Sequence, residues 1–142
     1  MGGGISSRLF QALRERQGLA YDMESRLETY ADTGLWLIRT ACDPRHSQDC
    51  RAAVEHCVLN LIHTGPAPEE MAVSRRHLFA ELLIMQDDAD ACMERLAREA
   101  IYLGQHPELK ERVQRLASVT PGGIATVLGH AWREAAFVEW SP

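Results

Sequence analysis

A change of hydrophobic period at Gly18 constrains the fold of this chain more than any other feature of its sequence. Before this glycine, apolar residues recur at helical spacing, which predicts an amphipathic helix that ends near Gln17. The apolar face of that helix consists of Ile5, Leu9, Phe10 and Leu13. Ser6 or Ser7 can cap its N-terminus, because a serine hydroxyl accepts a hydrogen bond from the free backbone N–H groups of the first turn.

After Gly18 the period changes to two, which predicts a strand with one wet face over residues 19–30. The apolar face of this strand is assigned to Leu19, Tyr21, Met23, Ser25, Leu27 and Thr29. The segment Asp32-Thr33-Gly34 then predicts a hairpin turn. The returning strand begins with residues 35–38, which are apolar on both faces, so we expect it to be more buried than the first strand.

The rest of the chain is predicted to form five helices and a final strand, which are separated by proline, glycine and aspartate signals. The helices are expected at about residues 44–64, 69–86, 88–103, 107–118 and 120–132, and the strand at residues 136–140. Helices that follow an antiparallel hairpin predict an α+β fold, in which helices pack on one face of an antiparallel sheet. A chain of 142 residues is expected to form a single domain over residues 1–142.

Composition excludes several classes of function. The formal net charge is −5 and Lys110 is the only lysine, so the chain lacks the clustered cations that bind nucleic acid. No stretch approaches the roughly 20 apolar residues of a membrane helix. Met1 is followed by glycines and serines rather than by the apolar run of a signal peptide. This observation leaves the compartment open, with a cytoplasmic location preferred over a periplasmic one.

The glycine triplet at residues 2–4 fits neither of the common phosphate-binding motifs. A P-loop needs a lysine after its last glycine, and none follows here. The dinucleotide fingerprint G-x-G-x-x-G needs a preceding strand and a third glycine at the position that Ser7 occupies. Nucleotide binding is therefore not expected.

A different pattern accounts for the triplet. The run GGGISSRLF, followed by LRE and then by GLAY, resembles a segment in the C-terminal half of pitrilysin/insulinase-family zinc metallopeptidases and of their relatives, the mitochondrial processing peptidases. These three elements are residues 2–10, 13–15 and 18–21 of this chain. The resemblance continues through YADTG at residues 30–34 and, more weakly, through PEEM at residues 68–71 and through residues 96–104.

The resemblance implies that two similar halves face each other around a closed chamber and have different roles. The catalytic half binds zinc through the two histidines of H-x-x-E-H and a distant glutamate, while the glutamate of the motif activates water. The other half closes the chamber and helps to hold the peptide substrate. This chain resembles the later portion of the non-catalytic half, so we expect that an N-terminal part of that half is missing from it.

The same resemblance implies that Arg14 and Tyr21 contact the peptide, because the arginine of the LRE element and the tyrosine of the GLAY element do so in the family. A guanidinium and a phenol are donors that can hold a peptide carbonyl and, near zinc, stabilise an oxyanion. Two simpler interpretations stay open: Arg14 as a solvated surface residue, and Tyr21 as a core residue on the apolar face of its strand.

The sequence contains no H-x-x-E-H, and the nearest string, AAVEH at residues 52–56, has Ala52 in place of the first histidine. We therefore expect no catalytic residue and no metal ligand in this chain. Zinc is expected in a catalytic half supplied in cis or by a partner subunit. An open sheet edge predicts self-association of the chain. The alternative is a catalytically silent structural or interaction module of the same fold.

Four cysteines raise the question of disulfides or a structural metal. None of them forms C-x-x-C; they are Cys42, Cys50, Cys57 and Cys92. Cys50 and Cys57 are two turns apart on a predicted helix, whereas His56 faces a different direction from its neighbour Cys57. Reduced, structural thiols are therefore the favoured interpretation.

Overall fold

The computed structural model of the chain describes residues 7–30 and 32–140. Its elements, in chain order, are the short helix α1 (Arg8–Phe10), the π-helix η1 (Gln11–Arg16), strands β1 (Ala20–Thr29) and β2 (Gly34–Cys42), the 3-10 helix η2 (Pro44–His46), and helices α2 (Ser47–Thr64), α3 (Pro68–Asp87), α4 (Ala89–Leu103), α5 (Leu109–Ser118) and α6 (Pro121–Arg133). A hairpin followed by helices confirms the predicted α+β fold class. The chain divides into two compact units, residues 1–65 with 125–142, and residues 66–124.

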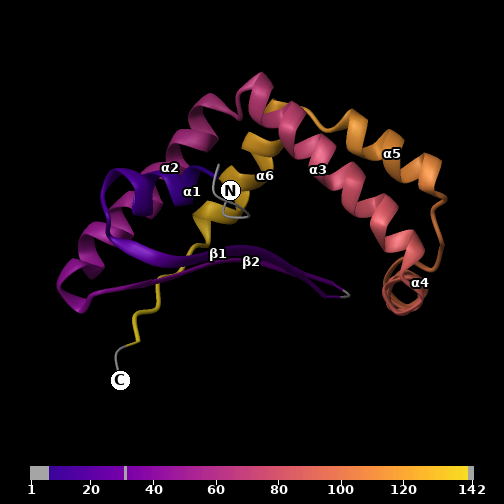
Figure 1. Ribbon diagram of the computed structural model, residues 1–142, viewed down its shortest axis with the longest axis horizontal. Helices are drawn as coiled ribbons and strands as arrows, with labels where there is room; N and C mark the ends of the chain where they lie inside the picture. The colour runs from indigo at the N-terminus through magenta and orange to yellow at the C-terminus, as the bar shows by residue number, and fades with distance from the viewer. Residues whose placement is uncertain (1–6, 31, 141–142) are drawn as a thin grey trace. The chain divides into compact units, whose positions relative to one another are not determined.

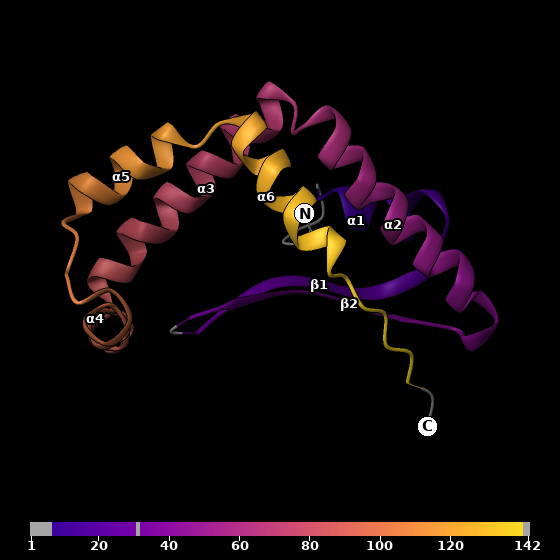
Figure 2. The same cartoon turned by 180° about the vertical axis from the view of Figure 1, so that it is seen from behind.

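The first unit is built on the antiparallel β1–β2 hairpin. The predicted turn is confirmed, since Thr29 pairs with Gly34 and the N–H of Tyr30 donates to the Thr33 carbonyl at 2.9 Å. Within this unit, helices α1, α2 and α6 lie over one face of the hairpin in both views (Figure 1, Figure 2). The other face carries charged residues of β1, as the alternation predicted for that strand: Arg39 of β2 pairs there with Asp22 and Glu24, at 3.5 Å and 3.9 Å.

The core of the first unit lies between the hairpin and these helices. Leu9 and Leu13, from α1 and η1, and Val58 of α2 are fully buried. The other buried members of this cluster are Ala20, Cys50, Ala53, Val54 and Cys57. The strand residues that pack against the cluster are Met23, Trp36, Ile38 and Cys42. Apolar residues at helical spacing, Val54, Cys57, Val58, Leu61 and Ile62, predict the inner face of α2, and the first four of them are buried.

Two expectations about strands are wrong. Strand β2 is not more buried than β1, because its residues 36–38 are half-buried and Leu35 is exposed. The helices of this unit cover only one face of β2, so the apolar residues on its other face stay accessible to solvent. The predicted final strand at residues 136–140 does not form either. Instead, Phe137 packs edge-on against Trp132 at a centroid distance of 5.8 Å, and Arg51 lies 4.0 Å from the Phe137 ring centroid.

The turn from η1 into β1 depends on Gly18. Its φ is 61°, in the left-handed region that glycine adopts without steric cost. The N–H of Gly18 donates to the Arg14 carbonyl at 3.1 Å, and the N–H of Leu19 donates to the Leu13 carbonyl at 2.7 Å. These bonds satisfy two carbonyls at the end of the helix, so the predicted glycine stop is confirmed.

The second unit consists of helices α3, α4 and α5. The break predicted at Asp87 and Asp88 is confirmed, because α3 ends at Asp87 and the Asp88 carboxylate accepts hydrogen bonds from two backbone N–H groups in the first turn of α4. Glu99 of α4 forms an ion pair with Arg112 of α5, and both side chains are largely buried. This pair links two helices whose connecting segment contains Pro107. The sequence predicted that Pro107 begins the second of them, but α5 begins two residues later, at Leu109.

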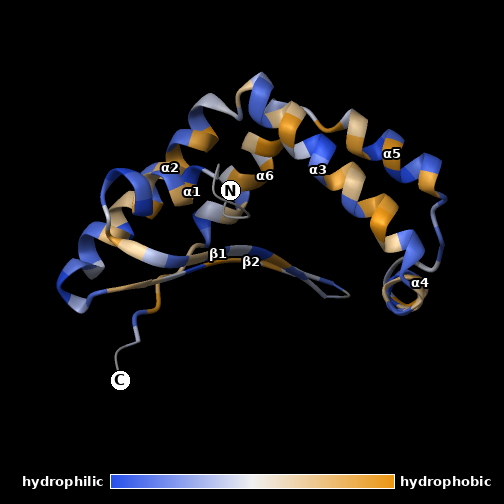
Figure 3. Ribbon diagram, in the orientation of Figure 1, coloured by the Kyte–Doolittle hydropathy of each residue, from blue (hydrophilic) through white to orange (hydrophobic). Residues whose placement is uncertain are grey.

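Apolar and polar residues alternate along all the helices (Figure 3). This alternation is typical of helices that bury one face and expose the other to water. In the described ranges, 7–30 and 32–140, no helix is both long enough and apolar enough to cross a membrane.

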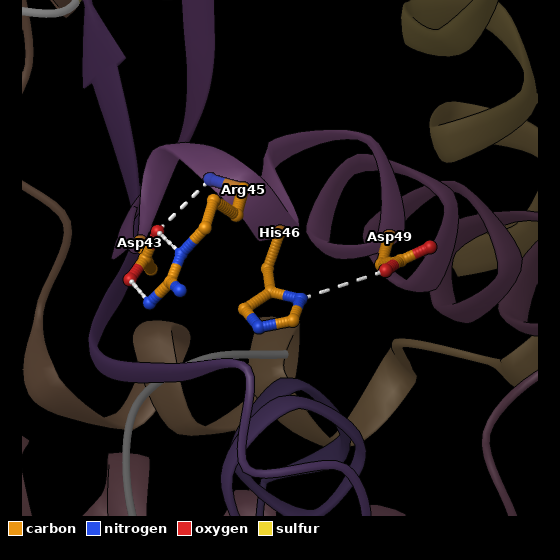
Figure 4. A network of polar contacts seen from close by, with 4 residues as sticks. All are labelled: Asp43, Arg45, His46 and Asp49. Carbon is orange, nitrogen blue, oxygen red and sulfur yellow. Dashed lines mark hydrogen bonds and ion pairs between the residues drawn. The ribbon is translucent and has the colours of Figure 1, made fainter.

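A network of polar contacts connects β2 to α2 (Figure 4). The Asp43 carboxylate accepts hydrogen bonds from the backbone N–H of Arg45 at 2.9 Å and from its guanidinium at 2.7 Å and 3.1 Å. The Arg45 contacts lower the pKa of Asp43 from 3.8 to about 2. In the first turn of α2, the Nδ1 atom of His46 lies 3.7 Å from the Asp49 carboxylate. Asp43 therefore caps η2, which begins at Pro44 as the sequence predicted.

Replacement of Arg45 by glutamine is expected to raise the pKa of Asp43 towards 3.8, because the charged partner of its carboxylate is lost. A carboxylate with a lowered pKa in the folded state stabilises the fold above pH 3.8, and this contribution is lost as the pH falls towards about 2. The variant should therefore lose stability less steeply in that window. An NMR titration of the carboxyl carbon measures the pKa, and an unchanged value in Arg45→Gln would contradict this account. Arg39→Gln is the control, because Arg39 pairs with other carboxylates.

Substitution Gly18→Ala is expected to lower the free energy of unfolding by about 1–2 kcal/mol, the cost of a left-handed conformation for an L-residue. A Cβ at this position meets nothing within 4 Å, so the cost comes from the backbone and not from a clash. Gly122→Ala is the matched control, since its Cβ also meets nothing and its φ is not positive. Guanidinium denaturation of the 142-residue chain gives both values. Equal effects of the two substitutions would rule out the role assigned to Gly18.

Candidate functional site

Buried leucines hold the helical part of the site, α1 and η1, against the core. The Ser7 hydroxyl accepts a hydrogen bond from the Phe10 N–H at 3.3 Å and so caps α1, as predicted; Ser6 and the glycine triplet lie outside the described residues. Leu9 and Leu13 point into the core, and Arg14 follows directly as an exposed residue. The helix continues as the π-helix η1, in which i→i+5 bonds widen the turn. Single π turns of this kind are frequent at functional sites.

The strand part of the site is a β-bulge at Tyr21. Ala20 pairs with Cys42, but Asp22 pairs with Ala41, so β1 has one residue more than β2 at this point, and that residue is Tyr21. Because of the bulge, the predicted apolar face of the strand is wrong at Tyr21. Ala20 is buried and Met23 packs against the core, whereas the Tyr21 side chain is 76% exposed. Tyr21 is therefore not a core residue, because the extra residue shifts the alternation and turns its side chain towards solvent.

The two predicted site residues meet in the structure. The guanidinium carbon of Arg14 lies 5.8 Å from the centroid of the Tyr21 ring and 5.0 Å from the centroid of the Phe10 ring. Both distances are within the range of a cation–π interaction. Arg14 therefore contacts an aromatic ring from its own helix and another from the bulge of β1. In the part of the chain that the structure describes, its guanidinium has no hydrogen-bond or ion-pair partner.

This arrangement leaves hydrogen-bond donors available at a fixed place. The aromatic rings attract the cation through their electron-rich faces and do not occupy its N–H groups. The Tyr21 hydroxyl, too, has no hydrogen-bond partner among the described residues. The site can therefore offer a cationic fork and a phenolic O–H to carbonyl or carboxylate oxygens of a ligand.

The family resemblance pointed to Arg14 and Tyr21, but the sequence analysis did not predict that Phe10 contacts Arg14. Phe10 was predicted only as an apolar residue of the helix, and it is half-buried. The signal that could have found it is the spacing of four residues between Phe10 and Arg14, which brings side chains together on one side of a helix. The bulge at Tyr21 has no comparable signal, because polar and apolar residues alternate without interruption on both sides of this residue.

The structure does not bring the cysteines and histidines together as a metal site. Within residues 7–30 and 32–140, no three His, Cys, Asp or Glu side chains gather in a way that could hold a metal ion. Burial raises the pKa of the Cys57 thiol, which disfavours the thiolate that a metal would need. Cys50 faces elsewhere, with its sulfur 3.0 Å from the Thr40 hydroxyl.

Comparison with known proteins gives a relative and a structural neighbour for almost the whole chain. The chain is 30% identical over 130 residues to a protein of Mycobacterium bovis described as an uncharacterized zinc protease, and the match covers 92% of this chain and 30% of that protein. The mitochondrial-processing peptidase subunit alpha of Caenorhabditis elegans is 23% identical, over 89% of this chain and 24% of that subunit. This chain thus spans about a third or less of the length of these relatives.

The fold agrees with the structure of a peptidase M16 inactive domain from Pseudomonas fluorescens, with a TM-score of 0.77 at 20% sequence identity. That match covers 91% of this chain and 31% of the other. The family described as the peptidase M16 inactive domain matches residues 1–78, more than half of the chain, including Arg14 and Tyr21. The resemblance seen in the sequence is therefore confirmed: this chain belongs to the family of the peptidase M16 inactive domain.

Proposed function

We propose that this chain is the substrate-holding, non-catalytic portion of a zinc-dependent peptidase, and that Arg14 and Tyr21 bind the peptide. The observation that carries the proposal is the contact of Arg14 with the Tyr21 ring, in which both side chains are exposed and keep their donors free within the described residues. Membership of the inactive-domain family supports a role in holding rather than cutting the substrate.

A peptide backbone presents carbonyl oxygens that need donors when the substrate is taken out of water. The Arg14 guanidinium can donate two parallel hydrogen bonds, and the Tyr21 hydroxyl can donate a third. Stacking between Phe10 and Tyr21 limits the positions of the guanidinium, so less conformational entropy is lost when the peptide binds. Donors held in this way can also stabilise negative charge that develops on a carbonyl oxygen near a zinc ion.

Hydrolysis on this proposal requires a catalytic half that carries H-x-x-E-H and binds zinc. The sequence of this chain has no such motif, and the chain spans about 30% of the length of the Mycobacterium bovis relative. The catalytic half can be supplied in the same polypeptide or by a partner subunit. On this proposal, the catalytic half of the whole enzyme binds zinc, and this chain lines the chamber in which the peptide substrate binds.

Arg14→Ala is expected to lower kcat/KM of the assembled peptidase about 10- to 100-fold, the range for loss of a hydrogen bond from a charged donor. Tyr21→Phe keeps the ring that contacts Arg14 and removes only the hydroxyl, so a smaller loss of about 2- to 10-fold is expected. The measurement is peptide hydrolysis by the complex of this chain with its zinc-bearing half, with circular dichroism to check that each variant is folded.

Arg16→Ala and Tyr102→Phe are the matched controls. Arg16 is an exposed arginine of the same π-helix, and Tyr102 is an exposed tyrosine of α4. Both should leave turnover unchanged. Full activity of folded Arg14→Ala and Tyr21→Phe would remove the site from the proposal and would favour the alternative, a catalytically silent structural or interaction module.

A further inference from the structure

Two cysteines lie next to each other where β2 leads into α2. Cys42 is the last residue of β2, and Cys50 lies in the first turns of α2 after the network of Asp43 and Arg45. The Cys50 sulfur is 3.0 Å from the hydroxyl of Thr40, which precedes Cys42 by two residues and so lies on the same face of the strand. Cys50 thus sits over the end of β2.

The two thiols are close enough to affect each other. Cys50 is buried in the core cluster, and Cys42 is half-buried and packs against that cluster. The pKa of Cys42 is raised, first by burial and then by the charge and hydrogen bonding of Cys50, with smaller contributions from Glu139 and Asp43. The raised pKa keeps most of the Cys42 thiol protonated, so its reaction with an oxidant is expected to be slow.

We propose that Cys42 and Cys50 are a redox-sensitive pair that closes an intramolecular disulfide when the chain meets hydrogen peroxide. The half-buried Cys42 is the sulfur that the oxidant can reach. Its thiol loses a proton, and the thiolate attacks one peroxide oxygen. The O–O bond breaks, the leaving hydroxide takes up the proton and departs as water, and Cys42 becomes a sulfenic acid. The Cys50 thiol then attacks the Cys42 sulfur and displaces a second water. The peroxide is reduced to two waters, and the two thiols are oxidised to one disulfide.

The position of the pair gives the disulfide a local consequence. Cys42 is the ladder partner of Ala20, the residue immediately before the bulge at Tyr21. A disulfide from Cys42 to Cys50 would tie the end of β2 covalently to α2, next to the bulge, and would close a short loop through Asp43 and Arg45. The proposal does not depend on peptide binding, because it rests on the packing of Cys42 against the cluster that contains Cys50 and on the contact of the Cys50 sulfur with Thr40.

Peptide mapping of the oxidised chain tests the proposal directly. The reduced 142-residue chain is treated with hydrogen peroxide, alkylated and digested with trypsin without reduction. Cleavage after Arg39, Arg45 and Arg51 places the two cysteines in separate peptides, residues 40–45 and 46–51. The expected product is these two peptides joined, with a mass two hydrogen atoms below their sum, and its loss after treatment with dithiothreitol. This linked pair should be the most abundant linked pair in the digest.

Three variants and a mixing experiment test whether the disulfide joins Cys42 to Cys50 and whether it forms within one chain. Cys42→Ser and Cys50→Ser should each abolish the linked pair, whereas Cys92→Ser, which changes a half-buried cysteine of the second unit, should leave it unchanged. Oxidation of a mixture of isotopically labelled and unlabelled chains should give no mixed pairs. Oxidation of Cys42 to a sulfinic acid without a link to Cys50, a dominant link to Cys57 or Cys92, or abundant mixed pairs would each overturn the proposal.

Discussion

Burial of Leu9 and Leu13 against α2 is the interaction on which the rest of the first unit depends. Both side chains are fully removed from solvent and contact the cluster around Val58, and each such burial contributes about 1.5–3 kcal/mol. With these two leucines held, the helix cannot rotate, so Arg14 has to face outward. Arg8 adds a second anchor, because its guanidinium donates to the Asn60 side chain at 2.8 Å and to the Gly65 carbonyl at 3.3 Å.

The candidate site then follows from two local departures from regular structure. The helix becomes a π-helix before Gly18, and β1 carries an additional residue just after it. Without the bulge, Tyr21 would be on the same face as Met23 and would be directed into the core. With it, the ring is exposed and within reach of Arg14. Both departures are irregularities that proteins often place beside functional residues, where they redirect a side chain.

Much of this architecture could be predicted from the sequence because it depends on local signals. The serine cap, the glycine stop at Gly18, the break at Asp87 and Asp88 and the helical spacing of apolar residues in α2 each act over a few residues, and the structure confirms them. The misses depend on contacts between distant segments. The bulge depends on how β1 pairs with β2, and the segment at 136–140 packs on Trp132 and Arg51 instead of a strand. The family resemblance pointed to Arg14 and Tyr21 as residues that contact the peptide, but nothing in the sequence predicted that the two side chains contact each other.

The most direct test of the account is a double-mutant cycle between Arg14 and Tyr21, measured as kcat/KM of the assembled peptidase. If the two side chains form one binding unit, Tyr21→Ala already releases the guanidinium, so Arg14→Ala should cost less in that background. The loss in the double variant should then be at least about threefold smaller than the product of the two single losses. If the losses simply multiply, Arg14 and Tyr21 act independently, and the claim that the bulge and the π-helix build a joint site would be contradicted.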